Sequence, residues 1–381
     1  MHTHSFFCAS AMIRTLLQRR RLSGLTKLEP LRFKAIKAAQ TSVSSNDFET
    51  PEVISSYNAE LPQQVTGAIS VSGAIHVPGE PAIFDAAKFK LPGSVRKSYP
   101  NWHNVKSSHF GFTNALEAAR IMNPTFRFDD IDVLVTRAVL VRLFEQVSSN
   151  GSNSWKWGLT LHTIHKTLVL SASHASTPGS DKTNNYGMGF ERAITRLPEY
   201  LHNAPSHLRL VKYKLGPLVC AVLIELDAVY EKPGDDSNVP KMSWAEITTT
   251  PVEGSSAVKP VQNIKFPNQW FGRTPYIIIG KHKDGNFRQV AVKEGTKAFL
   301  DWEQNAGQPG LQKLVTVLRV LYARVRATKS KAAKATFEHE TRHGSRDARL
   351  ALFARRPGTE YEPPLPPHLI ENFWKNPLPP K

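Results

Sequence analysis

The stretch Leu218-Val-Cys-Ala-Val-Leu-Ile-Glu-Leu-Asp-Ala-Val-Tyr230 and, after a polar segment, Ser243-Trp-Ala-Glu-Ile-Thr-Thr-Thr250 form two β-rich runs that decide the fold. Both runs carry carboxylates inside apolar sequence. Because side chains alternate between the two faces of a strand, Glu225 and Asp227 share one face, and Glu246 joins them if the runs pair. Buried carboxylates cost several kcal/mol each unless they are paired, hydrogen-bonded or bound to metal. The three residues therefore form a candidate divalent-cation site.

Composition predicts a folded globular protein with a polyanionic partner. The chain has 381 residues, is 40% hydrophobic and carries a net charge of +17, which favours nucleic acid, the ribosome or an anionic membrane surface as the partner. Only Cys8 and Cys220 are present, which excludes a disulfide framework, and Cys220 lies in an apolar run where it is expected to pack as a small hydrophobe. No apolar run approaches the ~18 residues of a membrane span.

The ends of the chain differ in composition from its middle. Residues 1–46 hold eight Lys or Arg and one acid, which is typical of a mitochondrial targeting segment; a nuclear signal at Arg19-Arg20-Arg21, or a disordered basic segment of a cytosolic protein, is the alternative. Residues 47–335 are expected to form one α/β domain, with an N-terminal arm and helices in 47–150, a sheet core in 151–290 and C-terminal helices in 296–335. Residues 336–381 are expected to be a basic and then Pro-rich tail.

Periodicity predicts helices over 114–122, 132–147 and 311–335, and strands within 155–172, over 206–216 and over 276–280, the last followed by a hairpin turn at 283–286. Asp129, Asp130 and Asp132 precede the second predicted helix and are interpreted as its caps. They do not form the repeated Asp-Asp-x-x-Asp motif that prenyl-diphosphate synthases use to bind magnesium.

Basic residues gather in two places. Arg209, Lys212 and Lys214 recur along one predicted strand, where they form either a solvated face or phosphate contacts. Between Lys313 and Arg356 there are twelve Lys or Arg and three acids, and Arg324 and Arg326 lie in this cationic strip. These five residues are the candidate nucleic-acid contacts.

Three motifs together resemble the DXO-like decapping exoribonucleases, a branch of the PD-(D/E)XK nuclease superfamily. Gly187-Met-Gly-Phe-Glu191 matches a Gly-aromatic/apolar-x-apolar-Glu motif, Glu225-Leu-Asp227 matches Glu-apolar-Asp, and Glu246-Ile-Thr248 matches part of Glu-apolar-Lys. Gln269, before the apolar run at 276–280, fits a downstream Gln. Over residues 55–325 the chain is also similar to uncharacterised fungal proteins, many of them labelled geranylgeranyl pyrophosphate synthetase; the acidic motif at Asp129 does not support that activity.

The resemblance implies a PD-(D/E)XK-like mixed central sheet flanked by helices and a metal-dependent hydrolase. Glu191, Glu225, Asp227 and Glu246 would hold Mg²⁺ or Mn²⁺, and Glu225, Asp227, Glu246 and Gln269 would be catalytic. From local sequence alone, Glu191 is equally interpreted as a helix-capping acid.

Thr248 stands where the motif places a lysine, and this departure separates two functions. Losing one electrostatic stabiliser costs roughly 10² in rate, so a nuclease acting on RNA 5′ ends would be weakened. Lys214 or Lys281 could replace the missing ammonium in space. The alternative is a catalytically degenerate fold that binds RNA or the ribosome. In a third interpretation, purely structural, Glu225 and Asp227 pair with Arg209 or Lys212.

Overall fold

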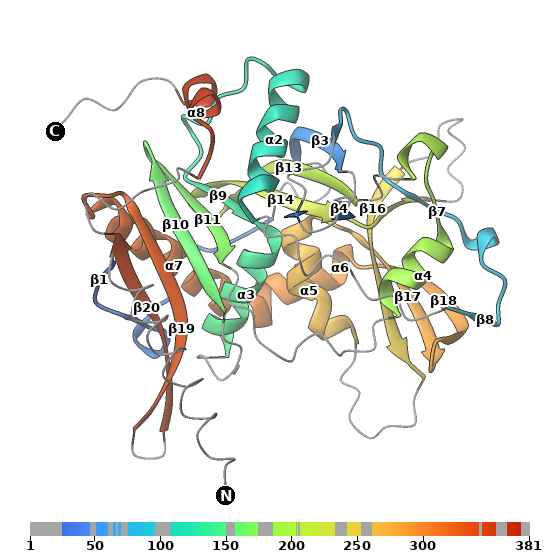
Figure 1. The fold of residues 1–381 in the computed structure, drawn as a ribbon. Helices are drawn as coiled ribbons and strands as arrows, with labels where there is room; N and C mark the ends of the chain where they lie inside the picture. The colour runs from blue at the N-terminus through green and yellow to red at the C-terminus, as the bar shows by residue number, and fades with distance from the viewer. Residues whose placement is uncertain are drawn as a thin grey trace, which may run out of the picture.

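The computed structural model describes residues 25–45, 51–59, 64–65, 68–69, 75–95, 108–149, 157–173, 186–202, 204, 206–232, 242–252, 261–342, 345–355 and 364–374. These residues form two large β-sheets with helices packed against them (Figure 1). The predicted mixture of helices and strands around mixed sheets is confirmed. Among the described helices, none is long and apolar enough to cross a membrane.

The larger sheet is mixed, because β9 runs parallel to both of its neighbours while the other pairs are antiparallel. Its strands, in spatial order, are β1 (Leu25–Lys27), β20 (Ser345–Arg355), β19 (Ala332–Arg342), β10 (Gly158–Ile164), β11 (Thr167–Ser173), β9 (Val133–Thr136), β14 (Leu218–Leu226), β13 (Ser206–Leu215), β3 (Glu52–Ala59) and β6 (Ile75–His76), with β2 (Leu31–Arg32) also paired to β20.

The smaller sheet is also mixed, with β16 and β17 parallel. Its order is β12 (Thr195–Arg196), β7 (Ile83–Phe84), β15 (Ala228–Glu231), β16 (Met242–Pro251), β17 (Tyr276–Lys283), β18 (Asn286–Glu294) and β8 (Gly93–Ser94). A separate short pair joins β4 (Gln64–Val65) to β5 (Ala68–Ile69).

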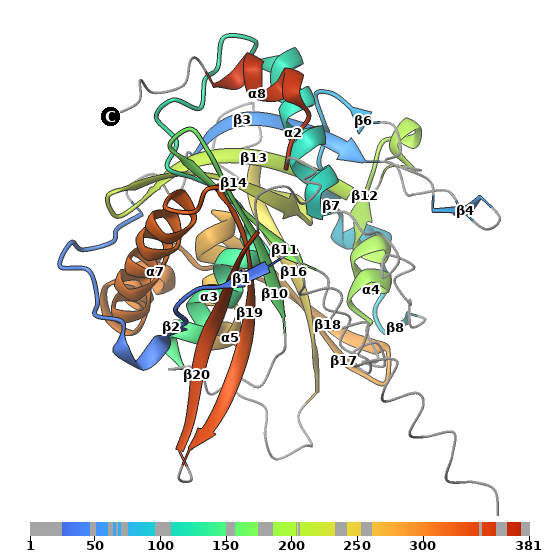
Figure 2. The same ribbon diagram turned by 60° about the vertical axis from the view of Figure 1, so that its left-hand side comes forward.

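Helices cover both faces of the larger sheet and one face of the smaller (Figures 1 and 2). One core lies between the larger sheet and α3 (Arg137–Ser148), α5 (Val261–Gly272), α6 (Thr296–Trp302) and α7 (Gln308–Arg326), with the π-helical turn Glu303–Gly307 between the last two. A second core lies on the opposite face under α2 (Ser108–Met122) and α8 (Pro367–Phe373). A third lies between the smaller sheet and α4 (Gly187–Ile194).

One continuous β-rich run passes directly from the larger sheet into the smaller one. β14 lies in the larger sheet and β15 in the smaller one, with only Asp227 between them. Along β14, Cys220, Val222 and Ile224 face the first core, while Ala221 and Leu223 face the second, so this strand is covered on both sides. That explains its continuous apolar sequence, and it places Asp227 where the sheets separate.

Four predicted segments differ from the structure. Residues 133–136, expected to begin a helix, form β9, whose parallel pairing on both sides overrides the helical periodicity. The predicted helix over 311–335 ends at Arg326, and β19 begins at Ala332. Much of the expected tail is integral to the fold, because β20 pairs with β19 and α8 packs in the second core. Likewise β1 and β2 bring part of residues 1–46 into the larger sheet.

Candidate functional site

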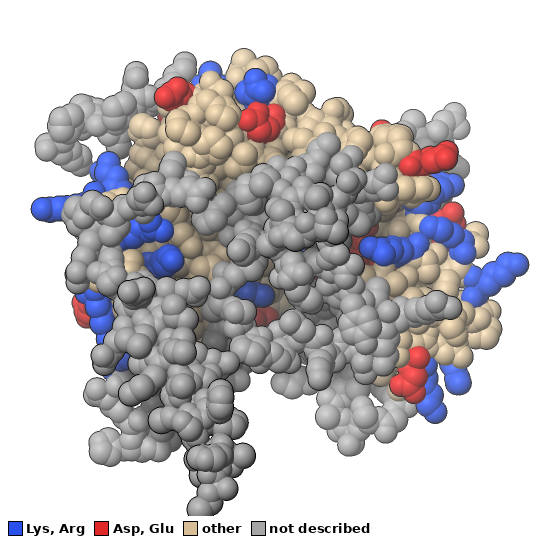
Figure 3. Space-filling model, viewed as in Figure 1, with Lys and Arg blue, Asp and Glu red and all other residues tan. Residues whose placement is uncertain are grey.

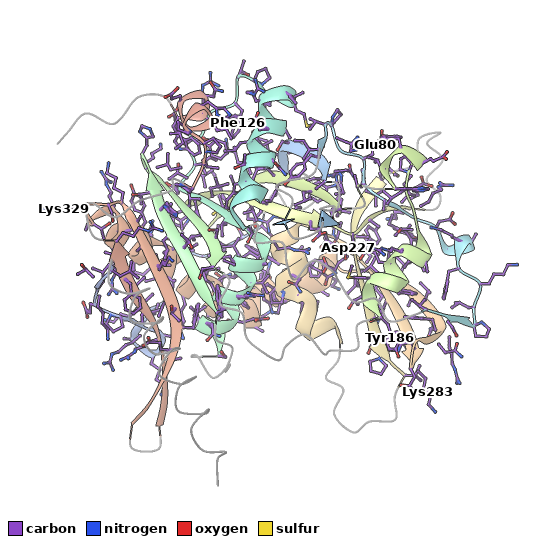
Figure 4. All side chains as sticks on the ribbon, in the orientation of Figure 1. Glu80, Phe126, Tyr186, Asp227, Lys283 and Lys329 are labelled. Atoms are coloured by element: carbon purple, nitrogen blue, oxygen red, sulfur yellow. The ribbon has the colours of Figure 1, made fainter. Side chains whose placement is uncertain are left out.

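Asp227 lies at the junction of the two sheets, as Figure 4 shows. Its half-buried carboxylate accepts a hydrogen bond from the Ile247 backbone N–H at 2.8 Å. β15 and β16 pair antiparallel from Ala228 and Ala245 onward, so Asp227 and Glu246 stand at the next opposed positions. The two β-rich runs therefore pair as expected, and the pairing brings their carboxylates together.

Glu246 is buried, and its carboxylate binds an arginine from another element. The Arg137 Nη1 atom donates to Glu246 Oε2 at 2.5 Å. Burial lowers the pKa of the Arg137 guanidinium, but the charges of Glu246 and Asp227 outweigh that effect, so its pKa is raised and it stays charged. Arg137 is thus the cation that compensates this carboxylate cluster.

The carboxylates at residues 191, 225, 227 and 246 form one electrostatic neighbourhood. Burial, and then the charges of Glu225 and Glu246, raise the pKa of Glu191 to about 8. Burial, followed by the charges of Glu246 and Glu191, raises the pKa of Asp227 well above its ordinary value. The four carboxylates therefore carry more negative charge than Arg137 and, beside Glu191, Arg192 can neutralise, and protons held on the carboxylates relieve the excess.

This donor set fits a divalent cation chemically, because Mg²⁺ and Mn²⁺ prefer carboxylate oxygens and would neutralise the excess charge. The ligand geometry is not assembled in this structure: among the described residues, no three His, Cys, Asp or Glu side chains are placed to hold one metal ion. Glu246 is bound to Arg137 and Asp227 to a backbone N–H. Glu225, which is exposed, follows Ala221 and Leu223 on the face of the second core. The assignment of these residues as metal ligands stays a prediction.

Thr248 lies on the same face of β16 as Glu246 and is 8% exposed. Of the two lysines proposed to replace the motif ammonium, Lys281 is the better placed. β16 and β17 are parallel, and they pair Thr248 with Ile279 and Thr250 with Lys281. Exposed Lys281 therefore lies on the same face as Thr248, two positions further along the strands. Lys214 lies in the larger sheet and lines a different pocket.

Gln269 is buried on α5, and its amide Nε2 has no hydrogen-bond partner among the described residues. Gly272 lies three residues later and therefore on the same side of the helix. A Cβ at Gly272 would lie 3.1 Å from Arg137 Nη1. Gln269 therefore carries a free donor on the side of α5 that faces Arg137, which is consistent with its predicted catalytic role but does not test it.

The five predicted nucleic-acid contacts do not form one surface. Lys212 Nζ lies 2.7 Å from Asp130 and 3.6 Å from Glu52, and together with Lys214 it lines a pocket of about 680 Å³. The two arginines of α7 make local contacts, Arg324 to Glu29 and Arg326 to Tyr322. In Figure 3 the Lys and Arg side chains lie mainly toward the two lateral edges of the face shown, over the β19 and β20 side and over the α4 and β8 side.

Arg137 is the site residue that sequence reasoning missed. It opens α3, where Thr136 is the N-cap and its hydroxyl accepts from the Val139 N–H at 3.4 Å. A cation in the first turn of a helix opposes the helix dipole. This local conflict, directly after a buried strand, was the sequence signal that could have identified Arg137.

Other interpretations of the acidic residues are wrong. Asp129, Asp130 and Asp132 do not cap α3; Asp132 accepts from the Val219 N–H, and Asp130 pairs with Lys212. Glu191 is the fifth residue of α4, beyond the first turn where a cap would lie. The expected structural pairing of Glu225 and Asp227 with Arg209 or Lys212 is replaced by the interaction of the cluster with Arg137.

A family profile described as a domain of unknown function, DUF8563, matches residues 31–263 and 245–347. The chain belongs to the DUF8563 family. No protein with curated annotation matches it.

Solved structures show what fold this DUF8563 chain has. It is similar to Rai1 of Scheffersomyces stipitis in complex with (3′-NADP)+ and calcium ion, with 14% identity, a TM-score of 0.60, and coverage of 85% of this chain and 93% of that one. Candida albicans Rai1 in complex with pU5-Mn²⁺ is 11% identical, with a TM-score of 0.58 and coverage of 91% of this chain and 98% of that one. K. lactis Dxo1 in complex with manganese is 9% identical, with a TM-score of 0.54 and coverage of 88% of this chain and 100% of that one.

These likenesses confirm the DXO-like, PD-(D/E)XK-like fold implied by the sequence motifs. At such low identity they show the fold and leave the chemistry of the site to its own residues. None of the comparisons supports the geranylgeranyl pyrophosphate synthetase label.

Proposed function

We propose that this chain is a metal-dependent nuclease that acts on RNA 5′ ends or on a related phosphodiester, at a rate lowered by Thr248. The observation that carries the proposal is the excess of negative charge at the sheet junction, where four carboxylates face Arg137 and, beside Glu191, Arg192. Rai1 of C. albicans, which has the same fold, is described with pU5 and Mn²⁺. A nucleic-acid strand is also the partner that a net charge of +17 favours.

Glu191, Glu225, Asp227 and Glu246 would hold Mg²⁺ or Mn²⁺. Such an ion supplies Lewis-acid stabilisation of the charge that develops on phosphate and lowers the pKa of bound water. Ligation requires Glu191 and Asp227 to lose their protons, and Glu246 to share its carboxylate with the metal.

The other residues orient the reacting groups. The Ile247 N–H fixes one oxygen of Asp227, leaving the second oxygen of that carboxylate for ligation. Arg137, released in part from Glu246, can donate to a phosphoryl oxygen through its planar guanidinium. The free Gln269 Nε2 is a further donor on the same side of α5. Thr248 supplies a hydroxyl but no positive charge beside the attacking water.

The test is degradation of capped, 5′-phosphorylated and single-stranded RNA with Mn²⁺ or Mg²⁺. Asp227→Asn and Glu225→Gln are each expected to reduce the rate at least ~10²-fold. Asp129→Asn is the matched control, because Asp129 is exposed and lies outside the cluster. No product from wild-type protein, or equal product from wild type and Asp227→Asn, would refute the nuclease proposal.

The second candidate is a catalytically degenerate RNA-binding or ribosome-associated protein. It is favoured by Thr248 and by the ligand geometry, since no three described acidic, His or Cys side chains are arranged around one ion. RNA binding that is salt-sensitive, unaffected by EDTA and unchanged by Asp227→Asn would select it over the first.

A mitochondrial location is proposed from the basic residues 1–46, and residues 1–24 lie outside the described part of the structure. A fusion of residues 1–46 to a fluorescent protein should co-localise with mitochondria. A nuclear or diffuse signal would contradict this proposal.

A further inference from the structure

Arg209 on β13 is a half-buried cation with no acidic partner among the residues that the structure describes. Its guanidinium carbon lies 4.6 Å from the centroid of the Trp244 ring, and its Nε donates to His207 Nε2 at 2.8 Å. No described Asp or Glu forms an ion pair with it, and neither terminal amino group donates to a described residue. Lys212, three positions along the same strand, is by contrast paired with two acids.

The position of Arg209 is fixed by a chain of buried hydrogen bonds. Because arginine only donates, His207 Nε2 must be the acceptor, and the ring proton is therefore on Nδ1. That proton points to Asn58 Oδ1 at 3.3 Å, and Asn58 is held in turn by the Glu80 backbone, through contacts of 2.7 and 3.0 Å. His207 and Asn58 are 1% and 0% exposed. These contacts form a built site rather than a mobile surface side chain.

The same residues keep the arginine charged but destabilised. Burial lowers the pKa of Arg209 to about 10. Burial, and then the charge of Arg209, lower the pKa of His207 to about 3, so the imidazole remains a neutral acceptor. An uncompensated cation that has lost part of its hydration gains stability from a bound anion.

The geometry also places Arg209 beside the carboxylate site. Trp244 and Glu246 alternate with Ala245 on β16, so they share a face. Arg209 lies over the first and Arg137 contacts the second. The residues that the two arginines contact are therefore two positions apart on one strand, a backbone separation of roughly 7 Å, so an anion held by Arg209 would lie on the Trp244 side of Glu246.

We propose that Arg209, oriented by His207 and stacked on Trp244, binds a phosphate group of an RNA strand adjacent to the carboxylate site. Its two terminal amino groups, which donate to no described residue, present the planar arrangement that pairs with two phosphate oxygens. The claim that the bound phosphate belongs to RNA rests on the proposed function. The claim that Arg209 binds a phosphate does not.

The test measures binding of two fluorescent oligouridylates, one with a 5′-phosphate and one with a 5′-hydroxyl, in EDTA at several salt concentrations. Arg209→Gln is expected to weaken binding about tenfold and to lower the slope of log affinity against log salt by about 0.7, the value for one lost phosphate contact on a single strand. Loss with the 5′-phosphate strand alone assigns Arg209 to the terminal phosphate, and equal loss with both strands assigns it to an internal phosphodiester.

Arg120→Gln is the control, with the same change in charge. Arg120 lies on α2, on the opposite face of the larger sheet, with its side chain 56% exposed. Arg209→Lys keeps the positive charge but loses the planar pair of amino groups, so it should retain the salt slope and lose part of the affinity. This variant replaces Arg209→Gln in the test if Arg209→Gln fails to fold. The inference is overturned if the Arg209 variants match Arg120→Gln in both affinity and slope.

Adenosine 5′-monophosphate separates this inference from the proposed function. If wild type binds RNA and the Arg209 variants bind it equally, the phosphate site is wrong and RNA binding stands. If wild type binds no RNA but the nucleotide raises its melting temperature, and Arg209→Gln abolishes the rise, the phosphate site stands without the proposed function. If wild type neither binds RNA nor gains melting temperature from the nucleotide, the phosphate site and the proposed function are both refuted.

Discussion

Thr248 decides how much catalysis the carboxylate cluster can support. It lies on the face of Glu246 and is 8% exposed, so a lysine there would reach toward the same carboxylates. We expect Thr248→Lys to raise Mn²⁺-dependent RNA degradation by roughly 10²-fold, by restoring one electrostatic stabiliser. Thr250→Lys, two residues along the same face, is the control and should give little gain. An unchanged rate in Thr248→Lys would favour the degenerate RNA-binding protein.

Glu191 should make the stability of the protein depend on pH. Its pKa is raised from 4.5 to about 8, so the folded state keeps a proton that the unfolded state has lost. This contribution is fully present below pH 4.5 and disappears as the pH rises to about 8. We therefore expect the midpoint of urea unfolding to fall more steeply between pH 5 and about 8 in wild type than in Glu191→Gln.

Added Mn²⁺ should oppose that fall, because binding requires the deprotonated carboxylate. The stabilisation by Mn²⁺ is therefore expected to be larger at pH 8 than at pH 6. Parallel pH profiles for wild type and Glu191→Gln would contradict the raised pKa of Glu191.

The acidic residues of this site were easier to identify from the sequence than its arginines. Glu225, Asp227 and Glu246 stood out because charge is rare in apolar strands, and strand pairing explains why Asp227 and Glu246 meet. Arg137 contacts Glu246 from 109 residues away, so no local pattern could pair them. The isolation of Arg209 from the described acids was equally hidden, because Trp244, over which it lies, belongs to a strand of the other sheet.

At the scale of elements, the strands covered on both faces were the clearest to predict. β10, β11, β13 and β17 lie where the apolar runs placed them, and Asp284 and Gly285 form the hairpin turn with positive φ of 51° and 86°. β9 was mistaken for the start of α3 because four residues are too few to distinguish the two periods. The division of β14 and β15 between two sheets depends on long-range pairing that the continuous apolar run does not reveal.

Gly280 controls how closely α4 approaches the smaller sheet. A Cβ there would lie 2.5 Å from two atoms of the Phe190 ring, and Phe190 precedes Glu191 on α4. We expect Gly280→Ala to displace α4, to destabilise the fold by ~1–3 kcal/mol and to weaken Mn²⁺ binding measured by calorimetry.

The control for this variant is Gly158→Ala in β10, where a Cβ would meet Ser173 Oγ at 2.2 Å, in the larger sheet. It should lower stability without changing Mn²⁺ affinity. Equal effects of both variants on Mn²⁺ binding would show that the position of α4 does not matter for the site.

For the whole molecule, the site lies where two sheets diverge, and the chain termini stabilise one of them. The described N-terminal strands β1 and β2 pair with β20, while α8 closes the second core. Composition suggested separable ends, because basic and Pro-rich segments are typical of tails. The apolar residues Leu365, Leu369, Phe373 and Trp374 were the contrary signal, since each is at most 2% exposed.

Trp374 tests whether the C-terminal segment is structural. Its ring stacks on Phe128 at 4.7 Å, and its Nε1 donates to the Thr167 hydroxyl at 2.9 Å. We expect Trp374→Ala to lower the free energy of unfolding by ~3–5 kcal/mol, measured by urea denaturation, whereas exposed Glu371→Ala on the same helix should change it by no more than ~0.5 kcal/mol. Val219, which packs in the same core as Phe128, lies at the beginning of β14, about 20 Å along the strand from Glu225, so RNA binding measured well below both unfolding midpoints should match wild type. A Trp374→Ala protein as stable as Glu371→Ala would show that this segment does not contribute to the stability of the fold.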